Sequence, residues 1–348
     1  MHPRLRQFAS LLKSHQIDAY LITSDVNIRY LTDFPASESW LLVSPKKSFY
    51  VTDSRYTLEA RSGLSGVKVE QFAHSIIKTM FGLAGTHRLR NIAFDDRHVS
   101  LALFKDLKQA CPKGVKLLPK NNIIEQMREI KTVEEINHIR ECLRLNLDAY
   151  HYLKKVVVPG ITEKDALLRL ENYVKSRGAG FSFSPIIASG PNSCFPHARV
   201  SDRKIRNHEP VLVDMGIDIN GYKSDLTRMF FFGKITPLYQ KVYDSVAVAQ
   251  QKAIRMIRPG IPAAEVDHEA RNYLAGLKLA KYFGHSLGHG VGLEIHEAPR
   301  LSGKSQAVLK EGMVVTVEPA VYLPGQFGVR IEDMVLVTRG GCEVLSRP

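Results

Sequence analysis

The chain has few cysteines and no long apolar segment. Its 348 residues include four cysteines, scattered and without a CxxC pair. We therefore expect free thiols in a reducing cytosol rather than a disulfide framework or a zinc knuckle. The start of the chain, MHPRLRQFASLLKSHQ, lacks the apolar core of a signal peptide, and no run of about 18 apolar residues could cross a membrane. These absences predict a cytoplasmic protein without a membrane partner.

The basic charge is the feature of the composition that could indicate a binding partner. The net charge is +13 at pH 7, and strongly basic proteins can bind nucleic acid or anionic surfaces. The stretch HARVSDRKIRNHE is locally basic. However, Lys and Arg are spread along the chain, aromatic residues do not interleave with them, and no nucleic-acid motif is present. We therefore do not expect nucleic acid as a partner, and the charge instead favours solubility or the steering of peptides with a free carboxylate.

The length suits two domains, and no low-complexity segment or long linker separates them. Residues 1–124 contain the short strand patterns AYLIT, WLLVS and SFYVTD and two helical patterns, at 5–15 and 56–62, which together predict a small α/β domain. A charged amphipathic helix then begins in NNIIEQMREIKTVEEINHIRECLRL, where Thr132 and Glu135 have the spacing of a capping box. We place the domain boundary just before this helix, so that the second domain spans residues 125–348.

Three histidines and four acids stand out in the second domain. The histidines lie among glycines in the segment HSLGHGVGLEIHE, residues 285–297. The acids Asp214, Asp225, Glu318 and Glu332 each lie in a run that otherwise resembles a buried strand. Burying carboxylates is costly unless a positive charge neutralises them. The combination therefore indicates a metal site, although any one of these residues alone would more often serve packing or a turn.

The first two acids can be placed by geometry. Asn220-Gly221 between two strand patterns predicts a two-residue hairpin loop in which both residues have positive φ. Counting back from this loop puts Asp214 opposite Thr227, and Asp225 one diagonal step from Asp214 on the same face. Diagonal neighbours lie within roughly 7–8 Å, so the two carboxylates can share a cation. The alternation of a strand likewise puts Arg330 and Glu332 on one face.

An internal repeat supports a twofold arrangement of the second domain. Pro-Gly-Ile recurs at 159–161 and 259–261, and Asn-Tyr at 172–173 and 272–273, an offset of 100 residues in both cases. A helical pattern precedes each Pro-Gly, another follows it, and strand patterns come next. Two such units back to back predict a pseudo-twofold α+β domain with the metal between the halves.

The ordered set of acids and His289 resembles the five metal ligands of the pita-bread metallopeptidases, the family of methionine aminopeptidase, aminopeptidase P and prolidase. Residues 285–297 resemble the proline-peptidase signature. The resemblance is strong over residues 125–348 and weaker over the first domain, which is similar to the domain that proline peptidases and creatinase share. It implies a pita-bread fold, a homodimer, and five metal ligands: Asp214, Asp225, His289, Glu318 and Glu332.

The ligand types indicate the metal and the reaction. A set rich in oxygen with one imidazole suits Mn²⁺, with Co²⁺, Fe²⁺ or Zn²⁺ as alternatives. Five ligands, several able to bridge, suggest two ions roughly 3.5–4 Å apart, with a bridging hydroxide as the nucleophile on a peptide carbonyl. The resemblance implies that this peptide bond is an Xaa-Pro bond. By the resemblance, Glu318 also transfers the proton, and His197, His285 and His296 line the substrate pocket. Arg330 is expected to orient Asp214 or Glu332, and Tyr222 is a weaker candidate for a similar role.

Three functions remain open on the sequence. The first is a metal-dependent peptidase acting on short proline-containing peptides, with a dipeptidase slightly favoured over an aminopeptidase. The second is a metal-free C–N hydrolase like creatinase, which lacks the full ligand set that this chain has. The third is a binding protein that keeps the fold without catalysis, a route on which ligands are usually lost.

Overall fold

The computed structural model describes residues 2–347 and divides the chain into two compact units, residues 1–128 and 129–348. The boundary predicted from the sequence, at 124/125, precedes this division. The segment around it contains two helices, α6 (Ile123–Glu129) and α7 (Val133–Val156), with a break between them. Thr132 caps α7 in the predicted capping box with Glu135, and a residue in this extended cap conformation cannot continue a preceding helix.

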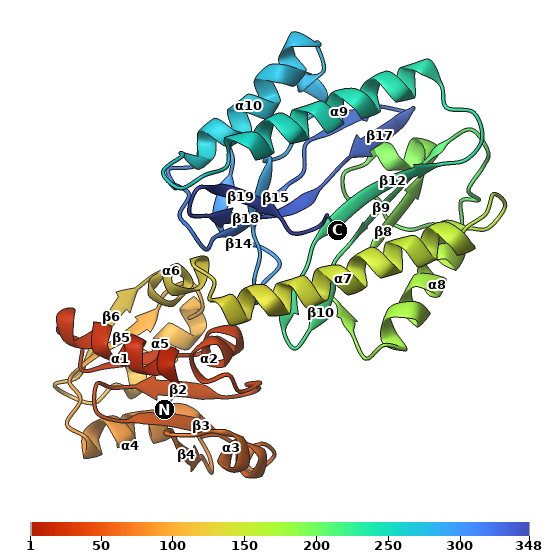
Figure 1. Cartoon of the computed structure of the whole chain (residues 1–348). Helices are drawn as coiled ribbons and strands as arrows, with labels where there is room; N and C mark the ends of the chain where they lie inside the picture. The colour runs from red at the N-terminus through yellow and green to blue at the C-terminus, as the bar shows by residue number, and fades with distance from the viewer. Residues whose placement is uncertain (1, 348) are drawn as a thin grey trace. The chain divides into compact units, whose positions relative to one another are not determined.

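The first unit is the small α/β domain that the sequence predicts (Figure 1). Its mixed sheet has the strand order β4-β3-β2-β1-β5-β6, in which β2 pairs antiparallel with both neighbours and the other pairs are parallel. The strands are β1 (Ala19–Ile22), β2 (Trp40–Val43), β3 (Ser48–Thr52), β4 (Lys68–Gln71), β5 (Asn91–Asp95) and β6 (Lys116–Lys120). The helices before α6 are α1 (Pro3–Ser14), α2 (Asp25–Thr32), α3 (Thr57–Gly63), α4 (Ile76–Thr86) and α5 (Leu101–Ala110).

The second unit consists of two halves, each a helix pair followed by strands (Figure 1). The first half contains α7, α8 (Glu163–Lys175), β7 (Gly180–Phe181), β8 (Ile186–Ser189), η1 (Gly190–Cys194), β9 (Pro210–Met215), β10 (Ile217–Ile219), β11 (Tyr222–Lys223) and β12 (Leu226–Phe231). The second contains α9 (Pro237–Met256), α10 (Ala263–Gly276), η2 (Ala280–Tyr282), β13 (Gly288–Gly290), β14 (Glu297–Leu301), β15 (Val314–Val317), β16 (Ala320–Leu323), β17 (Phe327–Arg330), β18 (Asp333–Thr338) and β19 (Gly341–Val344). Helices α7 and α8 pack on the strands of the first half, and α9 and α10 pack on those of the second.

The backbone repeats the pattern that the sequence repeat predicts. Gly160 and Gly260 both have positive φ, 103° and 88°, and each follows the first helix of its half. The amide of Gly160 donates to the carbonyl of Ile205, and that of Gly260 donates to the carbonyl of Leu309, at 2.8 and 2.9 Å. Each acceptor residue donates back to the isoleucine after its glycine. The two halves therefore turn from helix to helix in the same way, as a pseudo-twofold fold requires.

The predicted hairpin register is confirmed. Asn220 and Gly221 have φ values of 51° and 77°, as expected for a two-residue loop with positive φ. Asp214 on β9 pairs with Thr227 on β12, and Leu226 pairs with Met215, so the count from the loop holds without a bulge. Between these pairs the hairpin passes from one sheet to another at Gly216, where a Cβ atom would lie 2.2 Å from the carbonyl oxygen of Ser224.

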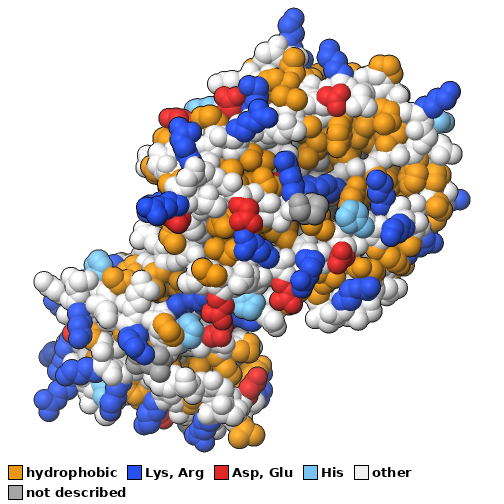
Figure 2. Space-filling model, in the orientation of Figure 1, with side chains coloured by type: hydrophobic (Ala, Val, Ile, Leu, Met, Phe, Trp, Pro, Cys, Tyr) orange, Lys and Arg blue, Asp and Glu red, His pale blue; other side chains and the backbone are white. Residues whose placement is uncertain are grey.

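The surface carries its basic charge in a dispersed form. On the face drawn in Figure 2, Lys and Arg side chains are scattered, with acidic and hydrophobic side chains between them. Within residues 2–347, no helix combines the length and the apolar character that crossing a bilayer requires.

Candidate metal centre and substrate pocket

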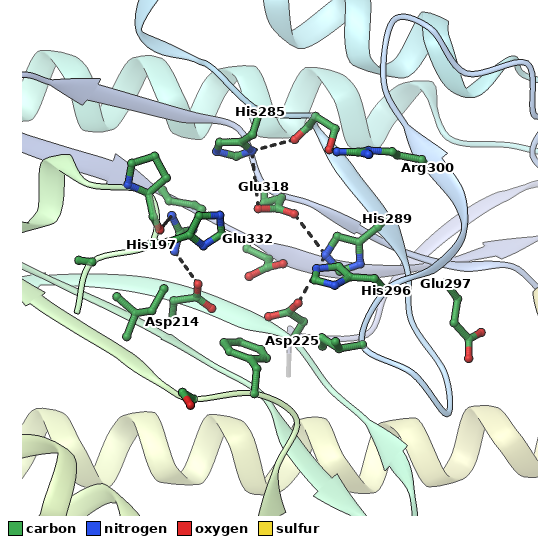
Figure 3. Close-up of a pocket in the computed structure, with 18 residues that line it drawn as sticks. His197, Asp214, Asp225, His285, His289, His296, Glu297, Arg300, Glu318 and Glu332 are labelled. Carbon is green, nitrogen blue, oxygen red and sulfur yellow. Dashed lines mark hydrogen bonds and ion pairs between the residues drawn. The ribbon is translucent and has the colours of Figure 1, made fainter. Parts of the chain in front are cut away.

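Three of the four acids lie beside strands rather than within them, which corrects the expectation from the sequence. Asp214 is within β9, whereas Asp225 directly precedes β12, Glu318 directly follows β15 and Glu332 directly precedes β18. At these interruptions the strand pairs separate, and the side chains turn towards a common cavity (Figure 3). The fifth residue, His289, is at the centre of β13.

The glycines beside His289 permit a close approach of strands. A Cβ atom at Gly288 would lie 2.0 Å from the carbonyl oxygen of Thr316 on β15, which no side chain could tolerate. The amide of His289 donates to the Thr316 hydroxyl at 3.1 Å. Its Nδ1 lies 3.1 Å from the carbonyl oxygen of Gly290, a contact that assigns the proton to Nδ1. Nε2 therefore faces the acids and is the ring nitrogen that can offer its lone pair to a cation bound there.

The imidazole of His289 lies between two carboxylates. Its Nε2 is 3.6 Å from Oδ2 of Asp225 and 3.4 Å from Oε1 of Glu318. One potential ligand atom from each of Asp225, His289 and Glu332 falls within 4.8 Å of the others. These separations leave room for a cation among the three side chains.

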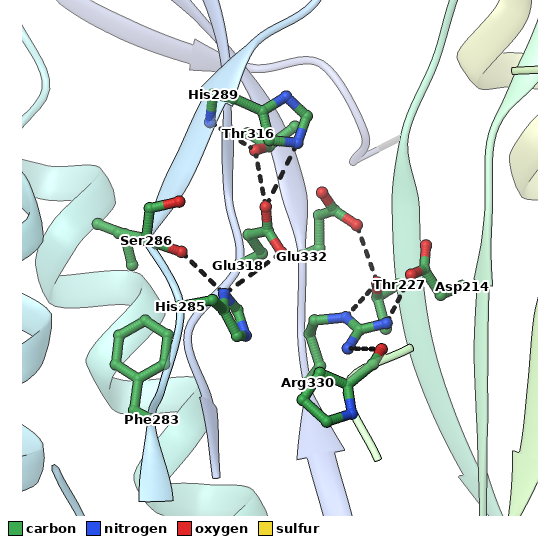
Figure 4. A network of polar contacts seen from close by, with 12 residues as sticks. Asp214, Thr227, Phe283, His285, Ser286, His289, Thr316, Glu318, Arg330 and Glu332 are labelled. Carbon is green, nitrogen blue, oxygen red and sulfur yellow. Dashed lines mark hydrogen bonds and ion pairs between the residues drawn. The ribbon is translucent and has the colours of Figure 1, made fainter. Parts of the chain in front are cut away.

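Arg330 holds the opposite side of the cluster, as Figure 4 shows. Its guanidinium donates to Oδ2 of Asp214 at 2.5 Å and, through Nε, to the Thr227 hydroxyl at 3.1 Å. That hydroxyl donates to Oε2 of Glu332 at 2.9 Å. Arg330 and Glu332 therefore meet on one face, as predicted, although a strand break separates them. The other oxygen of Asp214, Oδ1, is buried and has no hydrogen-bond partner among the described residues.

The cluster is electrostatically unsatisfied without a cation. Burial raises the pKa of Asp225 and Glu332 well above the usual range, and the neighbouring carboxylates add to both shifts. Burial also raises the pKa of Asp214 against the attraction of Arg330. Burial acts in the same direction on Glu318, but its contacts with His289 outweigh it and leave the pKa of Glu318 lowered. The guanidinium of Arg330 is one positive charge beside four carboxylates. Bound cations would therefore reduce the repulsion among the carboxylates.

A cavity of about 750 Å³ opens beside the cluster. All five proposed ligands line it, together with His197, His285, His296 and Arg330. The ring of His296 lies 4.4 Å from that of His289, and the His296 and His197 side chains are exposed at the cavity (Figure 3). Apolar and polar groups complete the lining: Phe183, Ser184, Ile186, Pro196, Ala198, Ser286, Ile295, Glu297 and Arg300.

Two contacts fix the orientation of His285. Its Nδ1 lies 2.8 Å from the carbonyl oxygen of Ser286, and its Nε2 lies 3.2 Å from the hydroxyl of Tyr322. Tyr322 also accepts a short hydrogen bond from Arg330. Arg330 is thus connected to His285 through Tyr322, a residue that the sequence analysis did not single out.

Tyr222 lies outside the cavity lining. Its hydroxyl lies 3.2 Å from Oε1 of Glu135, and its ring stacks on that of His138 at 5.1 Å. Both partners are on α7, so Tyr222 fastens the hairpin to this helix. Tyr222 is therefore a packed aromatic residue and not a residue that orients a metal ligand.

A second group of ligand types, Asp95, His98 and Glu125, lies in the first unit. Nε2 of His98 is 3.3 Å from Oε1 of Glu125 and 3.8 Å from Oδ2 of Asp95. Glu125 also accepts from Asn27 at 2.6 Å and is stabilised by the charge of Arg128. Because these partners already serve Glu125, we interpret the group as a polar network and place no metal there.

This network predicts a pH-dependent stability. Burial and then the charge of Glu125 raise the pKa of Asp95 from 3.8 to about 6. An acid with a raised pKa in the folded state contributes stability below pH 3.8, and this contribution is lost as the pH rises through about 6. We expect Asp95→Asn to be more stable than the wild type by about 1–3 kcal/mol at pH 8 and by little at pH 4. Thermal unfolding at both pH values measures this, with Asp96→Asn as the control; a difference independent of pH would contradict it.

Comparison with known proteins agrees with the fold. Residues 4–130 match the creatinase/prolidase N-terminal domain, and residues 137–339 match metallopeptidase family M24. An Xaa-Pro dipeptidase of Pyrococcus furiosus is 34% identical, over 100% of this chain and 98% of its own. The structure of an Xaa-Pro dipeptidase from Bacillus anthracis superposes with a TM-score of 0.95 at 33% identity, covering 99% of this chain and 97% of that one. An X-Pro aminopeptidase structure from Thermotoga maritima gives a TM-score of 0.90 at 31% identity, with 96% of each chain covered. The chain therefore belongs to metallopeptidase family M24, with a creatinase/prolidase N-terminal domain before the peptidase domain.

Proposed function

We propose that the protein is a metal-dependent peptidase that hydrolyses Xaa-Pro bonds in short peptides, and that dipeptides are its preferred substrates. The observation that carries this proposal is the set of four carboxylates and one imidazole, each buried or half-buried, at a cavity that is otherwise lined by histidine, arginine, apolar and a few polar side chains. Relatives and structural neighbours named Xaa-Pro dipeptidase or X-Pro aminopeptidase, each similar over nearly the whole chain, support the same substrate class.

The residues present fit a pair of divalent cations. Asp214 has a buried oxygen without a partner among the described residues, and burial together with the repulsion among the carboxylates raises the pKa of Asp225 and Glu332 well above the usual range. A set of oxygen ligands with one imidazole suits Mn²⁺ best, with Co²⁺, Fe²⁺ or Zn²⁺ as alternatives. We propose that two ions are held by five residues: Asp214, Asp225, His289, Glu318 and Glu332. When bound, such ions polarise a carbonyl group and lower the pKa of water.

The other side chains bind and orient the peptide. The exposed rings of His197 and His296 can each direct an N–H group into the cavity, where a donor to a developing oxyanion contributes roughly 2.7–4 kcal/mol. His285, held on both ring nitrogens, forms a fixed wall against the substrate. Glu318, whose pKa is lowered, is ionised at neutral pH and can accept a proton during the reaction. Arg330 keeps Asp214 in place.

The buried acids count against the two alternative functions. A metal-free hydrolase or a binding protein would gain nothing from four carboxylates at one cavity, and it would bear the cost of burying them. The proposal is tested by assaying the purified protein with Mn²⁺ on Ala-Pro, Ala-Pro-Ala and Ala-Ala. We expect fast hydrolysis of Ala-Pro, slower hydrolysis of Ala-Pro-Ala and little of Ala-Ala. Equal rates on Ala-Pro and Ala-Ala, or none on either proline peptide, would reject the proposal.

Arg300 is the proposed reason for a preference for dipeptides. It lies on β14 directly opposite His289, lines the cavity with an exposed side chain, and donates through Nε to the Ser286 hydroxyl at 3.2 Å. Its remaining N–H groups can bind the free carboxylate that follows proline in a dipeptide. A guanidinium–carboxylate pair of this kind is bidentate when both oxygens are engaged.

We expect Arg300→Ala to raise the KM for Ala-Pro by about 10–10²-fold, the value of a hydrogen bond to a charged group. The KM for Ala-Pro amide, which lacks the carboxylate, should change little. Steady-state kinetics on the two substrates measure this difference, with the exposed Arg339→Ala as a control. Equal increases for Ala-Pro and its amide would show that Arg300 does not recognise the carboxylate.

The homodimer that the resemblance implies stays a prediction, and so does the cytoplasmic location, which rests on the scattered cysteines and the absence of a signal-peptide pattern. Sedimentation of the purified protein would test the first.

A further inference from the structure

We propose that Asp267 and Arg271 on α10 are positioning residues for the substrate wall formed by His285. This inference rests on the proposed function, because it concerns how that site holds its substrate. The two residues lie one helical turn apart and touch none of the reacting groups themselves. Their partners are backbone atoms of residues 283–287, the segment that carries His285 into the cavity.

The pair consists of the buried carboxylate of Asp267 and the forked guanidinium of Arg271. Asp267 is fully buried and accepts from Nε of Arg271 at 2.7 Å and from its NH2 group at 3.1 Å. Arg271 is about one-third exposed, so only one member of the pair has access to water. Breaking such a pair from one side leaves the buried partner uncompensated.

The same two side chains fasten three residues of the segment. Arg271 donates to the carbonyl oxygen of Phe283 at 3.0 Å and makes a short hydrogen bond to that of His285. Asp267 accepts from the amide of Leu287 at 3.0 Å. The guanidinium also lies over the ring of Phe283, 4.3 Å from its centroid. Every second residue from 283 to 287 is therefore held by the helix.

These contacts act on the site because the segment is short and irregular. Residues 283–287 lie between η2 and β13 and outside both elements. Backbone hydrogen bonds hold the two ends of the segment, from the Phe283 amide to Ala280 and from the Glu318 amide to the Leu287 carbonyl, and the side chains on α10 add contacts that include the His285 carbonyl. The side chain of His285 contacts Tyr322, and the ring of Phe283 meets that of His285 edge-on at 5.0 Å. The Ser286 carbonyl and the Tyr322 hydroxyl orient the His285 ring, whereas the anchors on α10 hold the backbone that carries it, so their loss would displace the ring together with its segment.

A conservative variant separates positioning from folding. Arg271→Lys keeps a positive charge beside Asp267 but cannot bind the carboxylate and both carbonyl groups together. Displacement of a substrate-orienting group by about 1 Å can cost about 10²-fold in rate. We expect kcat/KM for Ala-Pro to fall by about 10–10²-fold, mainly through KM, with the Mn²⁺ content unchanged. Arg169→Lys, on α8 and bonded to the carbonyl of Val156, is the matched control and should leave KM unchanged.

A double-mutant cycle identifies the group through which Arg271 acts. If its effect passes through His285, Arg271→Lys should lower kcat/KM by less than about 2-fold in a His285→Ala background, because coupled residues are not additive. For Arg271→Ala, added guanidinium should restore part of the activity, since the position is open to solvent. Equal effects in the two backgrounds, or loss of Mn²⁺ in Arg271→Lys, would overturn the proposal.

Amide hydrogen exchange tests the anchoring without any assay of activity. In Arg271→Lys, residues 283–287 should exchange at least about 10-fold faster, while α10 itself stays protected. Unchanged exchange in this segment would contradict the inference even if activity fell. Faster exchange in a protein that fails to cleave Ala-Pro would instead reject the proposed function and leave the anchoring intact.

Discussion

Replacing Asp225 with Asn is expected to abolish peptidase activity, with a loss in kcat/KM of more than about 10³-fold. This exceeds the loss for one oxyanion donor, about 10²–10³-fold, because the substitution removes a charge that the bound cations require. Kinetics on Ala-Pro in saturating Mn²⁺, together with elemental analysis, measure activity and metal in the same preparation. Asp218→Asn is the matched control, because Asp218 lies on the same hairpin and pairs with Lys223 outside the cavity.

The same variant should be more stable than the wild type once metal is removed. In the metal-free protein Asp225 is a buried acid among other acids, and its raised pKa reflects that cost. We expect its replacement to add at least about 1 kcal/mol to the free energy of unfolding in chelator, and this advantage should vanish or reverse in Mn²⁺. Near-normal turnover by Asp225→Asn would show that the two-ion assignment is wrong.

His289 and His296 should fail in different ways, although their rings lie 4.4 Å apart. His289 lies between Asp225 and Glu318 with its Nε2 directed at them, so His289→Ala should lose metal and activity together. His296 is exposed at the cavity, so His296→Ala should keep its metal and lower kcat/KM by about 10²–10³-fold. Elemental analysis beside kinetics on Ala-Pro separates the two outcomes.

Loss of metal in His296→Ala, or full occupancy in His289→Ala, would mean that the two roles are reversed. A matched check is His208→Ala, at a surface histidine that binds the backbone of Lys234 and does not line the cavity. This variant should change neither the metal content nor kcat/KM.

Turn and repeat patterns in the sequence were sufficient to predict the structure where residues close together along the chain contact one another. The loop at Asn220-Gly221 fixes the register of its own hairpin, so the pairing of Asp214 with Thr227 followed by counting. The Pro-Gly-Ile repeat likewise marks the same helix-to-helix turn in both halves. The capping box at Thr132 was also predicted, and it starts α7.

Contacts between distant segments could not be read in this way. Thr227 and Tyr322 are uncharged residues in apolar runs, and they become important only because Arg330 reaches both. The interruptions at Glu318 and Glu332 depend on strands moving between sheets, which residue alternation does not reveal. Arg300 is one of many arginines in a basic chain until its pairing with His289 places it at the cavity.

The most direct test of the account is a titration of the metal-free protein with Mn²⁺, in which bound metal and hydrolysis of Ala-Pro are measured at each point. We expect activity to be absent in chelator, to rise as the sites fill and to saturate at two ions per chain, with no such rise in Asp225→Asn. Full hydrolysis of Ala-Pro by the chelator-treated protein, or saturation of the sites without activity, would contradict the claim that these four acids and His289 form the metal centre of an Xaa-Pro peptidase.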